Sequence, residues 1–227
     1  MTALKILIVV TSHGLLGDTG KPTGYYLPEV THPAKVFLSA GLGVDIASPD
    51  GGLAPIDPNS VDFSDPINQE LWNDSKFKYK LENTIAATSV DSTQYAAILF
   101  AGGHGTMWDF PNNTNLQRLA ANIYERGGVV AAVCHGPAAL VNIRLENGEY
   151  LVKGKRITSF TNSEEIAVEL DSVMPFPLET ELKNSGGVFI GQKDWEENVI
   201  VDERLITGQN PASAHAVGLA VVEAIKH

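Results

Sequence analysis

The sequence has a single cysteine, Cys134, among its 227 residues, and it is poor in positive charge. One cysteine excludes an intrachain disulfide and fits a reducing compartment, so we expect a cytoplasmic protein. The 16 Lys and Arg residues are outnumbered by 27 Asp and Glu, which gives a formal net charge of −11. The basic residues form no cluster along the chain. This balance argues against nucleic acid as a partner.

Long apolar runs are also missing. The N-terminus leads directly into an apolar segment at residues 6–10, which is too short for the core of a signal peptide and its cleavage site. No other run approaches the length of a membrane-spanning helix, so we expect no membrane partner. The hydrophobic fraction of 44% is ordinary for a packed globular protein, and neither repeats nor low-complexity tracts interrupt it.

Short apolar segments alternate with helical patterns along the chain. The predicted strands are 6–10, 44–48, 95–100, 129–133, 156–160, 199–201 and 205–207. Helices are predicted near 30–38, 68–84, 115–126 and 210–226, the first with Pro33 in its first turn. This alternation is typical of a parallel sheet covered on both faces. The sequence therefore predicts an α/β fold, a doubly wound, mostly parallel sheet sandwiched by helices in one domain.

Cys134 stands where a strand is expected to turn sharply into a helix. The apolar segment 129–133 ends at Cys134-His135-Gly136, and small helix-forming residues follow. Such a turn lifts its central side chain out of the sheet and points the next helix N-terminus at it. The partial positive charge there favours the thiolate, which is the nucleophilic form of cysteine. The alternative is that Cys134 is a small buried hydrophobic residue.

Ligands of doubly wound sheets bind beyond the carboxyl ends of the strands, where further candidates lie. Gly102, Gly103 and His104 follow the strand predicted at 95–100. Their backbone N–H groups, with that of His135, could form an oxyanion hole that binds substrate. The alternative is an ordinary strand-ending turn with His104 as a polar loop residue.

Three carboxylates are candidates for a role beside the thiol. His135 could orient or deprotonate the cysteine if a carboxylate holds its imidazole, and Glu164 or Glu165 is the natural source. Both could instead be acids of a helix start, with Thr161 and Glu164 as a capping box. Glu29 follows the first strand near a helix start, where acidic residues are common. The residues alone leave these alternatives open.

Taken together, these segments resemble the ThiJ/PfpI superfamily, which shares the class I glutamine amidotransferase-like, flavodoxin-type fold. The resemblance covers nearly the whole chain, and the motifs that carry it are Glu29 with His32-Pro33, then 101–105, 132–137, 157–161 and 207–214. The chain length and the irregular excursions at 49–66 and 171–198 resemble the larger branch of heat-shock chaperones and glutathione-independent glyoxalases (glyoxalase III). The resemblance implies a single domain over 1–227 with surface insertions at those two places.

The resemblance also implies roles for the candidate residues. Cys134 is the nucleophile, Glu29 is the carboxylate hydrogen-bonded to it, and His135 with Glu165 completes a Cys-His-Glu arrangement. Glu165 is preferred to Glu164 because it matches the family acid without a gap. The implied enzyme is a lyase (lactate dehydratase) that converts methylglyoxal, a small α-oxoaldehyde, to lactate. We expect no cofactor and no metal, because the members with a metal carry an N-terminal extension, and we expect a homodimer.

Three other functions remain open on this fold. The first is a holdase-type stress chaperone that uses exposed apolar surface. The second is a cysteine hydrolase or amidase; an amidotransferase is disfavoured because His135 adjoins the cysteine and no synthetase domain is fused to the chain. The third is a redox sensor, because a thiolate of low pKa oxidises readily.

Overall fold

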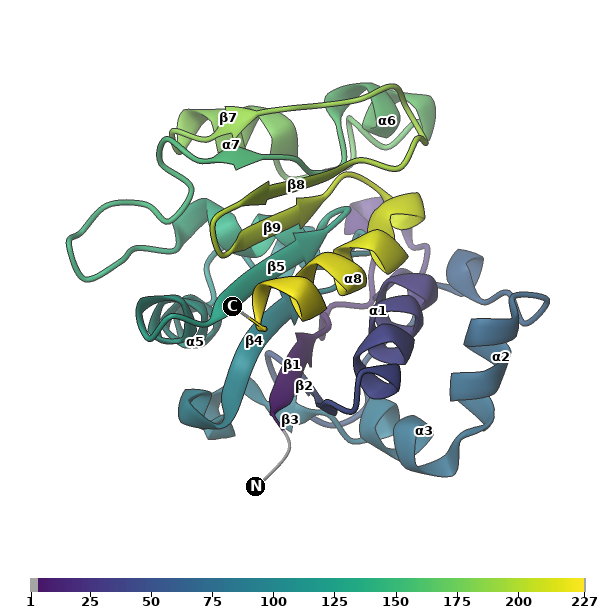
Figure 1. Cartoon of the computed structure of the whole chain (residues 1–227). Coiled ribbons are helices and arrows are strands. Elements are labelled where there is room, and N and C mark those ends of the chain that lie inside the picture. Colours follow the sequence, from purple (N-terminus) through teal and green to yellow (C-terminus); the bar gives the residue numbers. More distant parts are fainter. Residues whose placement is uncertain (1–3, 227) are drawn as a thin grey trace.

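A seven-stranded sheet forms the centre of the computed structural model, which describes residues 4–226 (Figure 1). Its strand order is β3-β2-β1-β4-β5-β9-β8, and all neighbours pair in parallel except β8 and β9. The strands are β1 (Lys5–Val9), β2 (Gly43–Ser48), β3 (Ile85–Ala86), β4 (Tyr95–Phe100), β5 (Val129–Val133), β8 (Val199–Asp202) and β9 (Leu205–Gly208). This confirms the predicted α/β fold. Residues 1–3 and 227, the two ends of the expected single domain, lie outside the described residues.

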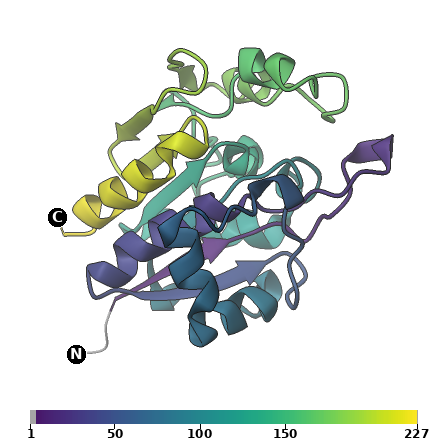
Figure 2. The ribbon, with the colours of Figure 1, turned by 90° about the vertical axis from the view of Figure 1, so that its right-hand side faces the viewer.

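Helices cover both faces of this sheet (Figures 1 and 2). Two helices, α1 and α8, lie side by side on one face, and α5 covers the other. Successive residues of a strand point to opposite faces, so Leu99 of β4 joins the core under α1 while Phe100 joins the core under α5. These three helices are α1 (Leu27–Ser39), α5 (Thr114–Glu125) and α8 (Ala214–Ala224).

The remaining elements are short. The other α-helices are α2 (Pro66–Asn73), α3 (Ser75–Glu82), α4 (Thr106–Asp109), α6 (Asn162–Ala167) and α7 (Leu178–Asn184). The 3₁₀ helices are η1 (Gly17–Thr19), η2 (Pro58–Ser60), η3 (Ala87–Ser89), η4 (Ser92–Gln94), η5 (Gly136–Asn142) and η6 (Pro211–Ser213). A second, two-stranded sheet pairs β6 (Arg156–Ile157) with β7 (Val188–Phe189).

Helix α1 begins earlier than the sequence predicted, at Leu27, so the placement of Pro33 in its first turn is wrong. Pro28 takes the second helical position, where a missing N–H costs little. Pro33 lies inside the helix, where it can donate no hydrogen bond to the carbonyl of Glu29, four residues earlier. Glu29 consequently stands in the first turn of a helix rather than in the loop before it.

Two other elements differ from the prediction. The helix expected over 68–84 is two helices, broken at Asp74, whose carboxylate caps the second by accepting two of its backbone N–H groups. The strand expected over 156–160 reaches only from Arg156 to Ile157 and pairs with β7, outside the main sheet. Hydrophobic patterning placed both elements correctly in the sequence. The capping bonds of Asp74 and the pairing of β6 with β7 determined how long each element is.

Both excursions contain regular structure. In 49–66, the hydroxyl of Ser60 accepts the N–H of Leu27 at 3.0 Å, so this segment holds the start of α1. The turn around Ser60 is itself fixed by Asp57, whose carboxylate caps η2 and accepts the hydroxyl of Thr23 at 3.1 Å. Segment 171–198, for which the sequence predicted an irregular excursion, contains α7 and β7.

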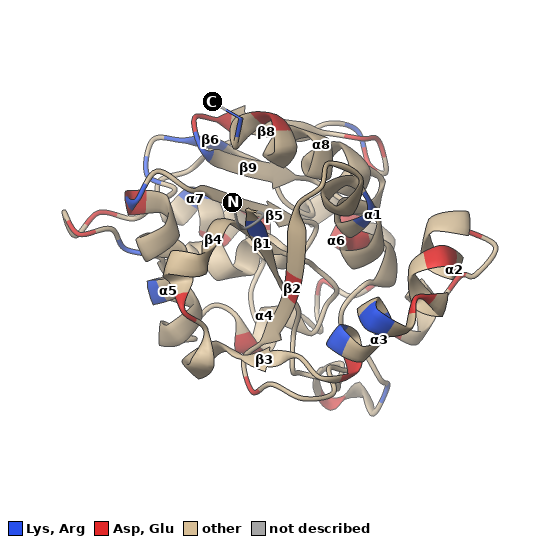
Figure 3. Ribbon diagram, turned by 60° about the horizontal axis from the view of Figure 1, so that its bottom comes forward, with Lys and Arg blue, Asp and Glu red and all other residues tan. Residues whose placement is uncertain are grey.

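Basic and acidic residues are intermixed along the fold. In the view of Figure 3, Lys and Arg positions are spread over several elements and lie among Asp and Glu positions. Within residues 4–226, we find no helix with both the length and the apolar character that crossing a bilayer requires.

The contact between α1 and α8 generates a stability prediction. A Cβ added at Gly218 of α8 would lie 2.9 Å from the Cα of Pro33 in α1. We expect Gly218→Ala to lower the free energy of unfolding by about 1–2 kcal/mol, because overpacking costs more than the gain of about 1 kcal/mol in helix propensity. Urea denaturation measures the change. Leu219→Ala, at a half-exposed position of the same helix, is the control, and an unchanged midpoint for Gly218→Ala would contradict the close approach.

Candidate active site

Cys134 occupies a sharp backbone turn at the carboxyl end of β5. Its φ of 58° lies in the left-handed region, which is strained for a residue other than glycine. Two hydrogen bonds hold this conformation: the N–H of Cys134 donates to the carbonyl of Gly208 at 3.0 Å, and its own carbonyl accepts the N–H of Phe160 at 2.8 Å. The predicted elbow is therefore present, and it is fixed from both sides of the strand.

The imidazole of His135 connects the thiol to a carboxylate. Its Nδ1 lies 3.3 Å from the Cys134 sulfur, and its Nε2 lies 2.7 Å from Oε2 of Glu165. Because a carboxylate can only accept, Nε2 carries the hydrogen and Nδ1 is left as an acceptor facing the sulfur. Burial lowers the pKa of His135, partly offset by Glu165, so this ring is a neutral base.

Glu164 and Glu165 have different surroundings, although they are neighbours on α6. Glu164 forms the capping box with Thr161, as the sequence suggested, and also accepts the side-chain amide of Asn210 at 2.8 Å. Those bonds hold the loops around α6 together. Glu165 is the residue that reaches His135.

His104 binds the same carboxylate as His135. Its Nε2 lies 3.0 Å from Oε1 of Glu165, and its ring centroid lies 4.2 Å from that of His135. The two histidines hold the pKa of Glu165 below its usual range, although burial works in the opposite direction. The sequence suggested a substrate-binding or ordinary loop role for His104, and it gave no sign of this contact because the two residues are far apart in the chain.

Glu29 approaches the thiol from the other side. Its side chain is fully buried in the first turn of α1, and its Oε2 accepts the N–H of Gly102 at 2.7 Å. Its Oε1 has no nitrogen or oxygen partner among residues 4–226, and the carboxyl lies within hydrogen-bonding reach of the Cys134 sulfur. Burial raises the pKa of Glu29 to about 8, against the lowering effect of these contacts. At neutral pH the carboxyl is therefore mostly protonated.

The sequence-based prediction of a helix-stabilised thiolate is wrong about the dominant effect. The segment after the elbow, η5, is a 3₁₀ helix, and burial raises the pKa of Cys134, as does a negative charge on Glu29. The N–H of His135 acts in the opposite direction. Since two adjacent buried groups cannot both be charged cheaply, Glu29 and Cys134 are both mostly protonated near neutral pH, and the carboxyl is the first of the two to lose its proton as pH rises. When Glu29 is the protonated partner, it supplies a donor to the sulfur.

The glycine pair is required by close packing. A Cβ on Gly102 would lie 2.5 Å from the Glu29 carboxyl and 2.7 Å from the backbone nitrogen of His135. Gly103 has a φ of 103°, and a Cβ there would collide with the carbonyl of Gly24. The amide of Gly102 is occupied by Glu29 and is not available to a substrate oxygen, whereas the amide of Gly103 makes no hydrogen bond within residues 4–226.

Two cavities reach the edge of this cluster at His104 and Glu165. One, of about 500 Å³, is lined by His104 and Tyr26 among others, and the other, of about 340 Å³, by Glu165 and Phe160. Sequence reasoning gave Tyr26 no role. Burial raises the pKa of Tyr26, as do Glu29 and Cys134, so it offers a neutral hydroxyl; its only sequence signal is its place before the α1 start.

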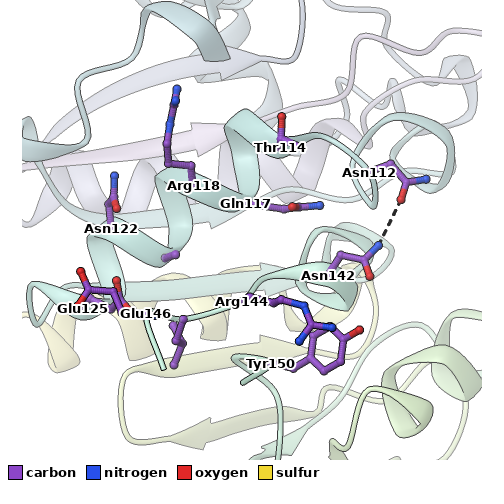
Figure 4. Close-up of a pocket in the computed structure, with 12 residues that line it drawn as sticks. Asn112, Thr114, Gln117, Arg118, Asn122, Glu125, Asn142, Arg144, Glu146 and Tyr150 are labelled. Atoms are coloured by element: carbon purple, nitrogen blue, oxygen red, sulfur yellow. Dashed lines mark hydrogen bonds between the residues drawn. The ribbon is translucent and has the colours of Figure 1, made fainter. Parts of the chain in front are cut away.

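Another hollow, of about 710 Å³, has a different character (Figure 4). It lies between α5 and the segment that follows η5, and Arg144 stacks 4.0 Å over the Tyr150 ring at one end. Amide, hydroxyl, arginine and glutamate side chains line it, without a cysteine or histidine among the lining residues. It therefore offers no nucleophile or base of the kind found around Cys134.

The chain is similar to known proteins over nearly its whole length. Residues 23–224 match the model of the DJ-1/PfpI family. The chain is 33% identical to Glyoxalase 3 of Candida albicans, covering 98% of this chain and 99% of that protein. It is 34% identical to the glutathione-independent glyoxalase HSP31 of Saccharomyces cerevisiae, covering 100% of both.

The fold of the chain is also similar to solved structures. The Rapid Encystment Protein 24 kDa of Francisella tularensis has a TM-score of 0.95 and 40% identity, over 98% of this chain and 99% of that one. The crystal structure of glyoxalase III from Candida albicans has a TM-score of 0.91 and 33% identity, over 97% of both chains.

The buried Glu29 generates a prediction about stability and pH. Its folded-state pKa is raised from 4.5 to about 8, so the folded state binds this proton more tightly and loses stability as pH rises through that interval. Glu29→Gln keeps an acceptor for Gly102 and a donor for the sulfur. We expect nearly equal unfolding free energies at about pH 4, below the unfolded-state pKa, and a variant more stable by up to about 5 kcal/mol at about pH 9.

Urea denaturation at both pH values measures this difference, and the wild-type chain is the matched control because it contains every other titrating group. Equal stabilities at the higher pH would mean that Glu29 is ionised in the folded protein without cost.

Proposed function

The chain belongs to the DJ-1/PfpI family, and we propose that it is a glutathione-independent glyoxalase that converts methylglyoxal to lactate at Cys134. Family membership confirms the resemblance carried by the sequence motifs. The observation that carries the proposal is one buried thiol flanked by two proton-handling groups: His135, held by Glu165, and Glu29, whose pKa is raised to about 8. The glyoxalase names of the full-length relatives support it.

The first step joins the substrate to the enzyme. Nδ1 of His135 takes the thiol proton, and the sulfur of Cys134 attacks the aldehyde carbon of methylglyoxal. A carbon–sulfur bond forms, the carbonyl double bond opens onto oxygen, and the proton is returned to that oxygen to give a hemithioacetal. The free amide of Gly103 and the amide of His135 are the candidate donors to the developing negative charge on oxygen.

The second step moves a proton between two adjacent carbons. Ionised Glu29 removes the hydrogen from the carbon bound to sulfur, which gives an enediolate whose negative charge lies on the neighbouring oxygen. The hydroxyl proton of the first carbon passes to that oxygen, and Glu29 returns its proton to the neighbouring carbon. The product is a thioester of lactate, so one carbon is oxidised while its neighbour is reduced and no external electron carrier is needed. A carboxyl with a pKa of about 8 both accepts and donates a proton near neutral pH.

The third step releases the product. His135, again neutral, takes a proton from water, and the resulting hydroxide attacks the thioester carbonyl. The carbon–sulfur bond breaks, lactate leaves and the thiol is restored. Glu165 keeps the imidazole in the tautomer that each of these transfers needs, because its oxygen accepts only from Nε2.

The remaining expectations form part of this proposal. The substrate is a small α-oxoaldehyde, which the cavities beside His104 and Glu165 can admit. The compartment is the cytoplasm, and the assembly is a homodimer; both stay predictions. A holdase role has less support, because the large exposed apolar side chains, such as Leu53 and Trp195, are dispersed over separate segments, and scattered exposure of this kind is normal.

An activity assay tests the proposal. Lactate formation from methylglyoxal without glutathione is followed for the wild type, Cys134→Ser and Glu29→Gln. We expect Cys134→Ser to lose all measurable turnover, because the nucleophile is gone, and Glu29→Gln to lose about 10²–10⁴-fold in kcat, because Gln cannot carry the proton. Arg118→Ala, at the distant hollow of Figure 4, is the control and keeps wild-type activity. Wild-type turnover by Cys134→Ser would overturn the mechanism.

A further inference from the structure

Three metal-ligand groups converge beside the thiol. One nitrogen each of His104 and His135 and a carboxylate oxygen of Glu165 all lie within 4.8 Å of one another. Both imidazoles direct Nε2 at this carboxylate, at 3.0 and 2.7 Å, so the three groups point to a common centre. The proposed reaction needs only His135 and Glu165 of the three, which leaves His104 without a chemical task.

We propose that His104, His135 and Glu165 form an inhibitory binding site for a divalent transition-metal ion such as Zn²⁺. Two imidazole nitrogens and one carboxylate oxygen are a ligand set that Zn²⁺ and its neighbours prefer, whereas Mg²⁺ and Ca²⁺ prefer all-oxygen sets. The metal as an inhibitor rests on the proposed function; the metal site itself does not.

The geometry requires little rearrangement. In a tetrahedral site with bonds of about 2.0–2.1 Å, two ligand atoms stand about 3.3 Å apart. The existing nitrogen–oxygen distances of 2.7 and 3.0 Å run to different oxygens of Glu165, Oε2 and Oε1, and the three candidate ligand atoms lie within 4.8 Å of one another. Small shifts of the imidazoles toward one of these oxygens give the spacing of the metal site, as the ion replaces the two hydrogens of the hydrogen bonds. The Phe160 ring packs 4.4 Å from that of His135 and limits its movement.

The site is enclosed yet reachable. The side chain of His135 is 1% exposed, and those of Glu165 and His104 are 11% and 18% exposed. His104 lines one of the two neighbouring cavities and Glu165 lines the other, so an ion can enter and a water molecule can complete its coordination. The charge of the ion compensates the Glu165 carboxylate.

The chemical consequence follows from the two ends of the His135 ring. With a metal on Nε2, the hydrogen of a neutral imidazole sits on Nδ1, the atom that faces the Cys134 sulfur. Nδ1 then donates instead of accepting, so it cannot take the thiol proton. The sulfur lies on the Nδ1 side of the ring and is not a member of the ligand cluster.

Cobalt titration tests the site without relying on activity. Co²⁺ is added to the full chain, and its visible d–d bands are recorded for the wild type, His104→Gln, Glu165→Gln, Cys134→Ser and His215→Gln. We expect one ion per chain in the wild type, displaced by Zn²⁺, and affinity lower by at least about 100-fold in His104→Gln and Glu165→Gln. Cys134→Ser and His215→Gln, the latter at an exposed position of α8, bind normally.

The outcomes separate this inference from the proposed function. Circular dichroism verifies that each variant is folded. If His104→Gln does not fold, Glu165→Gln serves as the variant that removes a ligand. Bands that persist in both variants, or that vanish in Cys134→Ser, would overturn the site in favour of metal capture elsewhere or by the thiol. In the lactate assay, Zn²⁺ inhibits the wild type reversibly, and the residual activity of His104→Gln is insensitive to it. If the wild-type chain binds cobalt at this site but makes no lactate, the glyoxalase function is contradicted and the metal site is not.

Discussion

The arrangement of the candidate site depends on one constraint: two ionisable groups, Glu29 and Cys134, are buried against each other where only one of them can be charged. Burial raises the pKa of both, and a charge on the carboxyl raises that of the thiol further. The carboxyl, with a pKa raised to about 8, therefore exchanges its proton near neutral pH, which is what a group that moves protons there requires. Gly102 maintains this balance, since its amide binds one carboxyl oxygen and any side chain at that position would push Glu29 away.

The fold brings these groups together through the ends of parallel strands. Cys134 follows β5, Gly102 follows β4, and Glu29 enters from the first turn of α1 after β1. The excursion at 49–66 determines where α1 starts, because Ser60 binds the amide of Leu27. The excursion at 171–198 acts in a similar way on α6, because the amide of Trp195 donates to Glu164 at 2.9 Å. Segments without chemistry of their own thus determine the positions of the reacting groups.

Glu165 is the second centre of the site, and its role differs from that of Glu29. Two histidines keep it ionised, so it acts as a fixed negative charge that selects the tautomer of His135. An ionised carboxylate between two imidazoles also provides the ligands for the proposed metal ion. His135 and Glu165 therefore support catalysis while hydrogens connect the cluster, and with His104 they oppose it when a metal ion does.

The sequence by itself determined the elements and their order, because buried strands and amphipathic helices are written in local hydrophobic periodicity. It also located the elbow at Cys134-His135 and the glycine pair, since abrupt pattern changes mark strand ends, whereas the roles of Glu29 and Glu165 came from the family resemblance. Only the tertiary structure decided that Pro33 lies inside α1, that Glu165 rather than Glu164 reaches His135, and that His104 joins them. It also reversed the expected effect on the thiol, because the pKa of a group depends on its burial and on charges contributed by distant segments, and no local pattern records either.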